Sequence, residues 1–161
     1  MEQIKNKLIL ILIMLFSFFA LISAYFIQYI LNHEPCNLCL IERIPYLLAI
    51  FFIILTMVSK RFEKIVLFLL SLVFIFGAIV SFYHFGIEQG FFQESSVCGV
   101  KSLTEIITKE DLLKQLSEKT ISCRDVTFRI FGLSLTSINI VISLLFIITL
   151  LKIFNKYEKN K

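Results

Sequence analysis

The chain has 161 residues, of which 58% are hydrophobic and only 17% are charged, and its formal net charge is +4. An ordinary soluble domain is about 25% charged, and a mean hydropathy of +0.87 leaves more apolar surface than such a domain can bury. The composition excludes a disordered chain, a collagen-like chain and a nucleic-acid-binding arm. It predicts one integral-membrane domain over residues 1–161.

Four apolar runs are long enough to cross a bilayer, which takes about 20 residues. They cover 8–31, 38–58, 65–87 and 130–151, and the second span itself is expected from about residue 40. The first run is too long for a signal peptide and lacks a small-residue cleavage site, so we expect it to be retained. Apolar residues do not alternate with period two, which argues against a membrane barrel. The predicted fold is therefore an all-α bundle of four transmembrane helices.

The distribution of lysine and arginine predicts the orientation of the spans. Residues 1–7, 59–64 and 152–161 hold nine cations in 23 positions, whereas 32–43 and 88–129 hold seven cations in 54 positions. The denser set is expected to be cytoplasmic. Both termini then lie inside, and both larger loops lie outside.

The long outer loop contains two segments that resemble helix capping boxes, Ser102–Glu105 and Thr108–Asp111. Leu112, Leu113 and Leu116 then share one helix face. We expect a short amphipathic helix here, lying either on the membrane surface or against the rest of the loop.

The four cysteines lie in the outer loops or at their edge, at Cys36, Cys39, Cys98 and Cys123. An oxidising outer compartment permits disulfides, and an even number divided two and two predicts two cysteine pairs. Chain proximity favours Cys36–Cys39 and Cys98–Cys123, although four cysteines allow three pairings and the sequence alone leaves the choice open.

The Cys-x-x-Cys pair favours redox chemistry over a structural role. A disulfide between Cys36 and Cys39 closes a very small loop and removes little entropy from the unfolded chain, whereas each thiolate has a resolving partner beside it. Arg43 shares a helix face with Cys39, where a guanidinium would stabilise a thiolate or a reduced, anionic acceptor. The alternative is a boundary cation that reaches the headgroups and pairs with Glu42 or Glu34.

Zinc is the competing use of four cysteines. All-cysteine zinc sites usually contain two close pairs, but 24 residues separate the second pair in this chain. His33 could substitute as a ligand, yet the predicted compartment favours disulfides. We therefore expect no metal.

The segment 35–43, Pro-Cys-Asn-Leu-Cys-Leu-Ile-Glu-Arg, resembles the DsbB family of membrane quinone-dependent disulfide oxidoreductases. The family pattern is Cys-x-Leu-Cys-x-x-x-Arg at the start of the second of four spans, and the segment meets it in full. The resemblance covers nearly the whole chain. It continues at Tyr83-His84, Gly86-Ile-Glu-Gln-Gly90, Cys98, Cys123 and Phe131-Gly-Leu-Ser-Leu135.

The resemblance implies an enzyme of the bacterial inner membrane. Such a protein reoxidises a periplasmic, DsbA-like thioredoxin-fold oxidase and passes the electrons to a membrane quinone, either ubiquinone or menaquinone. By this match, Cys98 would be attacked by the partner's thiolate, and Cys123 would be the other half of that pair. Cys36 would exchange with the loop pair, while Cys39 would face the quinone. Arg43 would hold a quinone oxygen.

His84 lies at the outer end of the third span, level with the Cys-x-x-Cys pair. The resemblance places it beside the quinone as a hydrogen-bond donor; the alternative is a histidine at the headgroup level, bonded to a loop carbonyl. Glu88, one turn further, is expected to be solvated. The membrane interfaces are expected to be anchored by Tyr25, Tyr29 and Tyr46.

Two other functions stay open. One is a membrane protein with purely structural disulfides, such as an assembly factor, whose disulfides would resist gentle reduction. The other is a quinone reductase resembling vitamin K epoxide reductase, which also places a Cys-x-x-Cys pair against a quinone. In that family the pair lies on a later helix, so its position at the start of the second span favours the DsbB-like function.

Overall fold

The structure is a computed structural model that describes residues 2–58, 63–94, 98, 122–124, 129–130 and 132–159. Its helices are α1 (Glu2–Tyr29), α2 (Asn37–Ile41), α3 (Ile44–Val58), α4 (Glu63–Glu88) and α6 (Leu135–Lys159). Strands β1 (Arg129–Ile130) and β2 (Leu133–Ser134) pair antiparallel. Within the described residues, four helical segments are long and apolar enough to cross a membrane: α1, α2 with α3, α4, and α6. The predicted four-helix membrane bundle is therefore confirmed.

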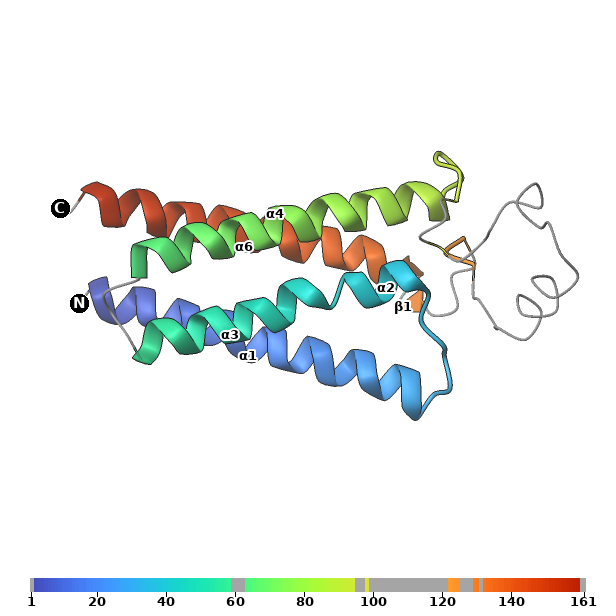
Figure 1. The fold of residues 1–161 in the computed structure, drawn as a ribbon, viewed down its shortest axis with the longest axis horizontal. Helices are drawn as coiled ribbons and strands as arrows, with labels where there is room; N and C mark the ends of the chain where they lie inside the picture. The colour runs from blue at the N-terminus through green and yellow to red at the C-terminus, as the bar shows by residue number, and fades with distance from the viewer. Residues whose placement is uncertain are drawn as a thin grey trace, which may run out of the picture.

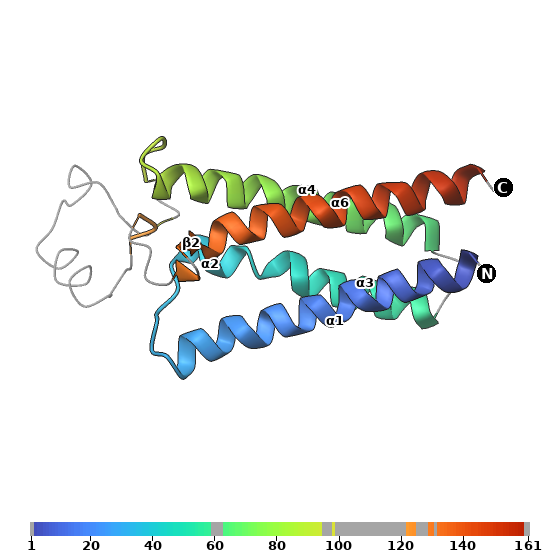
Figure 2. The same cartoon turned by 180° about the vertical axis from the view of Figure 1, so that it is seen from behind.

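The helices are arranged as two neighbouring pairs. Helix α1 lies beside α3, α4 lies beside α6, and α3 joins the pairs by packing on α4. The chain termini lie at one end of the bundle, together with the end of α3 and the start of α4 (Figures 1 and 2). The other end carries α2, the end of α4 and the start of α6. We call it the cysteine end, because α2 carries Cys39 and begins directly after Cys36.

The core of the bundle is apolar and closely packed. Its fully buried side chains are Ala49, Ile53, Leu67, Leu70, Phe74 and Leu150. The outer faces carry large exposed apolar residues such as Phe19, Phe51 and Phe82, which a membrane would cover. Because lipid is as apolar as the core, close contact rather than exclusion of water holds such helices together. An edge-on contact between the Phe74 and Phe146 rings, 4.9 Å between centroids, joins α4 to α6 in this way.

The second span is broken between α2 and α3, and Pro45 explains the break. Proline has no N–H, and its ring clashes with the carbonyl four residues earlier, in this case that of Ile41. The backbone N–H of Arg43 instead donates to the Leu40 carbonyl at 3.2 Å, a tighter turn than in an α-helix. The side chain of Glu42 then contacts α4 and α6, whereas that of Arg43 contacts α1.

Helix α4 passes close to α3 and α6 at Gly77. A Cβ atom at this position would lie 3.0 Å from Cγ of Pro45 and 3.8 Å from Oγ of Ser143. We expect Gly77→Leu to force the helices apart and to lower the free energy of unfolding by about 1–3 kcal/mol, measured as a lower unfolding temperature in detergent. Ile79→Leu is the control, because Ile79 is 63% exposed. An equal loss in both variants would contradict the close packing at Gly77.

The start of α6 differs from the sequence prediction. We expected a span from residue 130, but the strand pair occupies this position and the helix begins at Leu135. Gly132 has a φ of +83°, which favours glycine and permits the turn between the strands. The Ser134 hydroxyl oxygen accepts the Ser137 backbone N–H at 3.2 Å, a capping bond that fixes the start of the helix. The predicted amphipathic helix, at 102–116, lies outside the described residues.

Candidate active site

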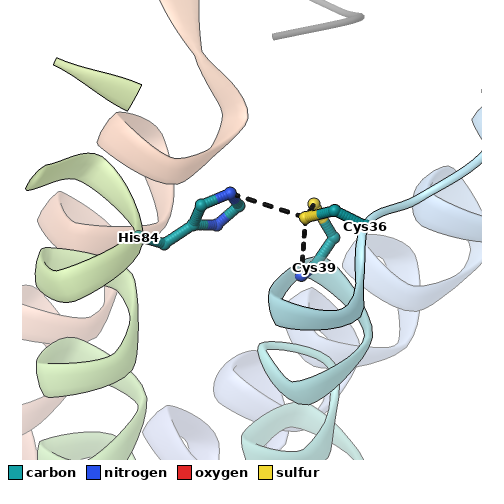
Figure 3. Close-up of side chains that lie close together, drawn as sticks. All are labelled: Cys36, Cys39 and His84. Atoms are coloured by element: carbon teal, nitrogen blue, oxygen red, sulfur yellow. Dashed lines mark hydrogen bonds between the residues drawn. The ribbon is translucent and has the colours of Figure 1, made fainter. Parts of the chain in front are cut away.

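Cys36 and Cys39 form a close pair at the start of α2. Cys36 has an extended backbone, with φ −70° and ψ 166°, and its sulfur caps the helix by accepting the Cys39 N–H at 3.3 Å. The two sulfur atoms lie 2.8 Å apart (Figure 3). A disulfide bond measures about 2.05 Å, so a small movement suffices to join or separate them. The geometry suits reversible oxidation.

The two loop cysteines lie against this pair. Cys98 and Cys123 are buried, with 1% and 2% of their surface exposed. The Cys123 thiol lies close enough to interact with both Cys36 and Cys98, and the three residues share one buried cluster. The four sulfurs therefore follow one another in the order Cys39, Cys36, Cys123, Cys98. The structure brings together both pairs that the sequence favoured, and in addition places Cys36 against Cys123.

These contacts separate the acidities of two thiols. Hydrogen bonds from the thiols of Cys123 and Cys39, in that order of size, lower the pKa of Cys36 well below that of an ordinary cysteine, and His84 adds to the effect against the opposing effect of burial. The bond to Cys36 and burial raise the pKa of the Cys123 thiol. The reduced site therefore concentrates negative charge on the Cys36 sulfur.

His84 lies between Cys36 and a buried carboxylate. Only 2% of the His84 surface is exposed. Its Nε2 atom is 3.5 Å from the Cys36 sulfur (Figure 3), and its Nδ1 atom is 2.8 Å from Oε1 of Glu42. The His84 imidazole, which α4 carries, thus links Cys36 at the start of α2 to Glu42 at the break in the second span.

Asn139 of α6 holds the other carboxylate oxygen. Its amide nitrogen donates to Oε2 of Glu42 at 3.0 Å and to the hydroxyl of Ser81 at 2.7 Å, and its carbonyl oxygen accepts the hydroxyl of Tyr46. Tyr46 is only 8% exposed, so the prediction that it anchors a membrane interface is wrong. Its hydroxyl finds a partner inside the bundle, which offsets the cost of burying it.

A second buried carboxylate, Glu88, lies one turn beyond His84. Its side chain is 5% exposed, so the expectation that it is solvated is wrong. The Thr136 hydroxyl donates to Oε1 of Glu88 at 2.7 Å, while Oε2 is buried without a hydrogen-bond partner within the described part of the chain. Helix α4 continues through Glu88, and residues four apart share a face, so this side chain stays on the bundle side.

A cavity of about 270 Å³ opens beside these groups, between α1 and α6. Its polar end contains Cys36, Cys39, Cys123, His84 and Glu88. Its apolar walls come from both helices and include Ala20, Ala24, Ile27, Leu135, Ile138 and Ile142. A cavity with apolar walls and a few converging polar groups is the usual form of a small-molecule site.

Arg43 lines the same cavity and contacts α1. One guanidinium nitrogen, Nη1, donates to the side-chain oxygen of Gln28 at 2.7 Å, and the guanidinium carbon lies 4.9 Å from the centroid of the Tyr25 ring. A guanidinium held by an amide and an aromatic face has a defined orientation. The carboxylate of the neighbouring Glu42 is engaged by His84 and Asn139.

Comparison with known proteins identifies the family. A family model described as "Disulfide bond formation protein DsbB" matches residues 6–153. The chain belongs to the DsbB family. The resemblance inferred from segment 35–43 is thus confirmed, and DsbB membership assigns a disulfide oxidoreductase role in a multi-pass membrane protein. The chain is also similar to "Uncharacterized protein RP370" of Rickettsia prowazekii (strain Madrid E), with 29% identity over 159 residues, 98% of this chain and 92% of the relative.

The structure gathers all six predicted site residues of this DsbB-family chain at the cysteine end. Five of them line the cavity, and Cys98 contacts Cys123. Sequence reasoning missed three polar residues that organise the site, namely Glu42 as a partner of His84, Thr136 and Asn139. The signal that could have found them is a polar side chain within an apolar run, because polar residues in a membrane span often mark a functional site.

The same geometry offers metal ligands. The ligand atoms of Cys36, Cys39 and His84 all lie within 4.8 Å of one another. Two reduced thiols and an imidazole are ligands that zinc accepts. The expectation that no metal is bound stays a prediction.

Proposed function

We propose that this chain takes electrons from a periplasmic, DsbA-like thioredoxin-fold oxidase and delivers them to a membrane quinone. The partner's dithiol becomes a disulfide, and the quinone becomes a quinol. Two electrons and two protons leave the partner and two of each enter the quinol, so the reaction balances without another reactant. The result sustains disulfide formation in exported proteins.

The observation that carries this proposal is the unbroken order of the four sulfurs. Disulfide exchange requires a thiolate to attack a disulfide sulfur directly. Cys123 contacts both Cys98 and Cys36, and Cys36 contacts Cys39. Each exchange can therefore occur between neighbouring sulfurs, from the loop to the cavity.

The exchanges follow this order. The partner's thiolate attacks Cys98 of a Cys98–Cys123 disulfide, and Cys123 leaves as a thiolate. Cys123 then attacks Cys36 of the Cys36–Cys39 disulfide, and Cys39 leaves as a thiolate beside the cavity. The partner's second thiol releases Cys98, which in turn attacks Cys123 and releases Cys36. In every step one S–S bond forms as another breaks.

The cavity fits a quinone head group, which is flat, largely apolar and carries an oxygen at each end. Its walls are apolar, whereas Cys39 and Arg43 lie at its polar end. The buried Oε2 atom of Glu88, which has no partner in the described part of the chain, also belongs to this end. When bound, a quinone supplies a two-electron acceptor. Arg43 would hold its oxygen and stabilise negative charge there.

The proposed location is the bacterial inner membrane, with the cysteine end facing the periplasm. The chain termini, the end of α3 and the start of α4 lie together at the opposite end (Figure 1). In the sequence these elements adjoin the cation-dense segments, which the positive-inside rule assigns to the cytoplasm.

Anaerobic quinone reduction tests the proposal. The purified protein in detergent would receive a reduced thioredoxin-fold dithiol and a soluble ubiquinone or menaquinone analogue. We expect wild type to consume one or both analogues and Cys36→Ser to consume neither, because serine cannot form a disulfide. Gel filtration would confirm that both samples are folded.

Two outcomes would contradict the proposed function. Folded wild type that reduces neither analogue would instead support purely structural disulfides. A Cys36→Ser variant with wild-type turnover would exclude the sulfur relay.

A further inference from the structure

The arrangement around His84 has the form of an activated nucleophile. In such sites a base lies within hydrogen-bond reach of the nucleophile, and a third group orients the base. Here Nε2 of His84 is 3.5 Å from the Cys36 sulfur, and Nδ1 is 2.8 Å from Oε1 of Glu42. All three residues are at most 9% exposed, so water does little to screen their interactions.

The carboxylate decides which nitrogen of His84 faces the sulfur. Ionised carboxylates only accept hydrogen bonds, so Glu42 requires a proton on Nδ1. Nε2 is then the atom that receives or donates a proton at Cys36. Asn139 donates to the second carboxylate oxygen at 3.0 Å, which keeps Glu42 from rotating away.

Glu42 needs a positive partner, because an isolated buried carboxylate is costly. Arg43 is the nearest cation along the chain, but its side chain contacts Gln28 and Tyr25 on α1. Among the residues that the structure describes, His84 is the group that touches the Glu42 carboxylate and can carry a positive charge. A protonated His84 lies between two anions, the carboxylate and the Cys36 thiolate.

We propose that His84 is the proton acceptor and donor for Cys36 and that Glu42 is the positioning residue that holds His84 in this role, an inference that rests on the proposed function. The Cys36 thiol proton moves to Nε2 of His84, which leaves a thiolate beside an imidazolium. Glu42 keeps its charge throughout and does not take the proton.

This pair acts when Cys36 is the leaving group. Cys98 attacks Cys123 of a Cys36–Cys123 disulfide, the Cys98–Cys123 bond forms, and the Cys36–Cys123 bond breaks. Both electrons of the broken bond leave on the Cys36 sulfur, where the imidazolium stabilises them. A leaving thiolate that is stabilised departs faster. The exchange consumes no further reactant.

Other groups face His84 and must be separated from Glu42 by experiment. Glu88, on the same helix, lies 3.8 Å from Nε2, and the Thr136 hydroxyl lies 3.2 Å from Nδ1. The remaining titratable side chains that line the cavity are those of His33, Glu34, Cys39, Arg43, Tyr46 and Cys123. Glu88→Gln is the matched control for Glu42→Gln, because both remove a buried carboxylate beside the same ring.

The test is a pH titration of ultraviolet thiolate absorbance in the reduced, purified protein, without quinone or partner. Cys36→Ser would identify the absorbance that belongs to Cys36. In wild type we expect this thiolate to persist well below the ordinary cysteine range. His84→Asn and Glu42→Gln are expected to raise its titration midpoint by about 1–3 pH units. Glu42→Asp should recover part of the shift, and Glu88→Gln should move the midpoint by less than about half a unit.

Equal shifts in Glu42→Gln and Glu88→Gln would overturn the proposal, since any buried negative charge would then act alike. An unchanged midpoint in His84→Asn would overturn it as well. These results are independent of the proposed function, because the titration contains no quinone. A wild-type protein that reduces quinone but whose Cys36 thiolate titrates in the ordinary cysteine range refutes only the His84–Glu42 pair. A wild-type protein whose Cys36 titration midpoint is lowered but which reduces no quinone refutes the proposed quinone-dependent function.

Discussion

Replacing Cys123 by serine is expected to slow oxidation of the thioredoxin-fold partner by more than about a thousandfold, the scale of losing a reacting group. Oxidation of a small dithiol such as dithiothreitol should continue at the wild-type rate. Cys123 is the sulfur that contacts both Cys98 and Cys36, so its loss disconnects the loop from the cavity. Dithiothreitol is small enough to reach Cys36 and Cys39 through the cavity that they line.

Quinone reduction would be measured with the thioredoxin-fold partner and with dithiothreitol as the electron donor in turn. Cys98→Ser should behave as Cys123→Ser does, because it removes the sulfur that we propose the partner attacks. Cys39→Ser should lose activity with both donors and is the matched control. A Cys123→Ser protein that oxidises the partner normally would show that the order of sulfurs is not the route of the electrons.

Replacing Arg43 by glutamine is expected to raise the KM for quinone by about 10- to 100-fold. A hydrogen bond from a charged group contributes about 1.5–3 kcal/mol, and each 1.4 kcal/mol changes binding about tenfold. Arg43 lines the cavity and is oriented by Gln28 and Tyr25. The KM of Arg43→Lys should fall between those of wild type and Arg43→Gln, because lysine keeps the charge but loses the planar fork of the guanidinium.

The measurement is quinone reduction over a range of analogue concentrations. Exchange between the partner and the cysteines, followed without quinone, should be unchanged in Arg43→Gln. Lys64→Gln is the control, since Lys64 lies at the other end of the bundle near Phe154. An unchanged KM in Arg43→Gln would remove this arginine from the quinone site.

The chemistry of α2 could be predicted from the sequence because it is local. Cys36 and Cys39 are close wherever their segment begins a helix, and Arg43 follows within about one turn. The contacts of Arg43 with α1 could not be predicted. They depend on the break at Pro45, because of which the Arg43 side chain points toward α1 while the Glu42 side chain points toward α4.

The errors at Tyr46 and Glu88 share a physical cause. In a soluble helix, an apolar stripe shows which side faces the core. In a membrane helix, lipid accepts the same residues as the core does, so the sequence does not reveal how the helix is rotated. Both side chains are buried in the bundle, and nothing in the apolar pattern around them distinguishes this from exposure.

The sequence by itself determined the membrane class, the four spans, the placement of the four cysteines in the outer loops and the family, because these follow from run length, composition and short-range spacing. Only the tertiary structure decided that Cys123 meets Cys36 and that His84 lies between Cys36 and Glu42. Glu42 contacts residues 42 and 97 positions away, at His84 and Asn139. Such contacts arise from how the helices pack, and packing is a property of the folded chain that no local pattern contains.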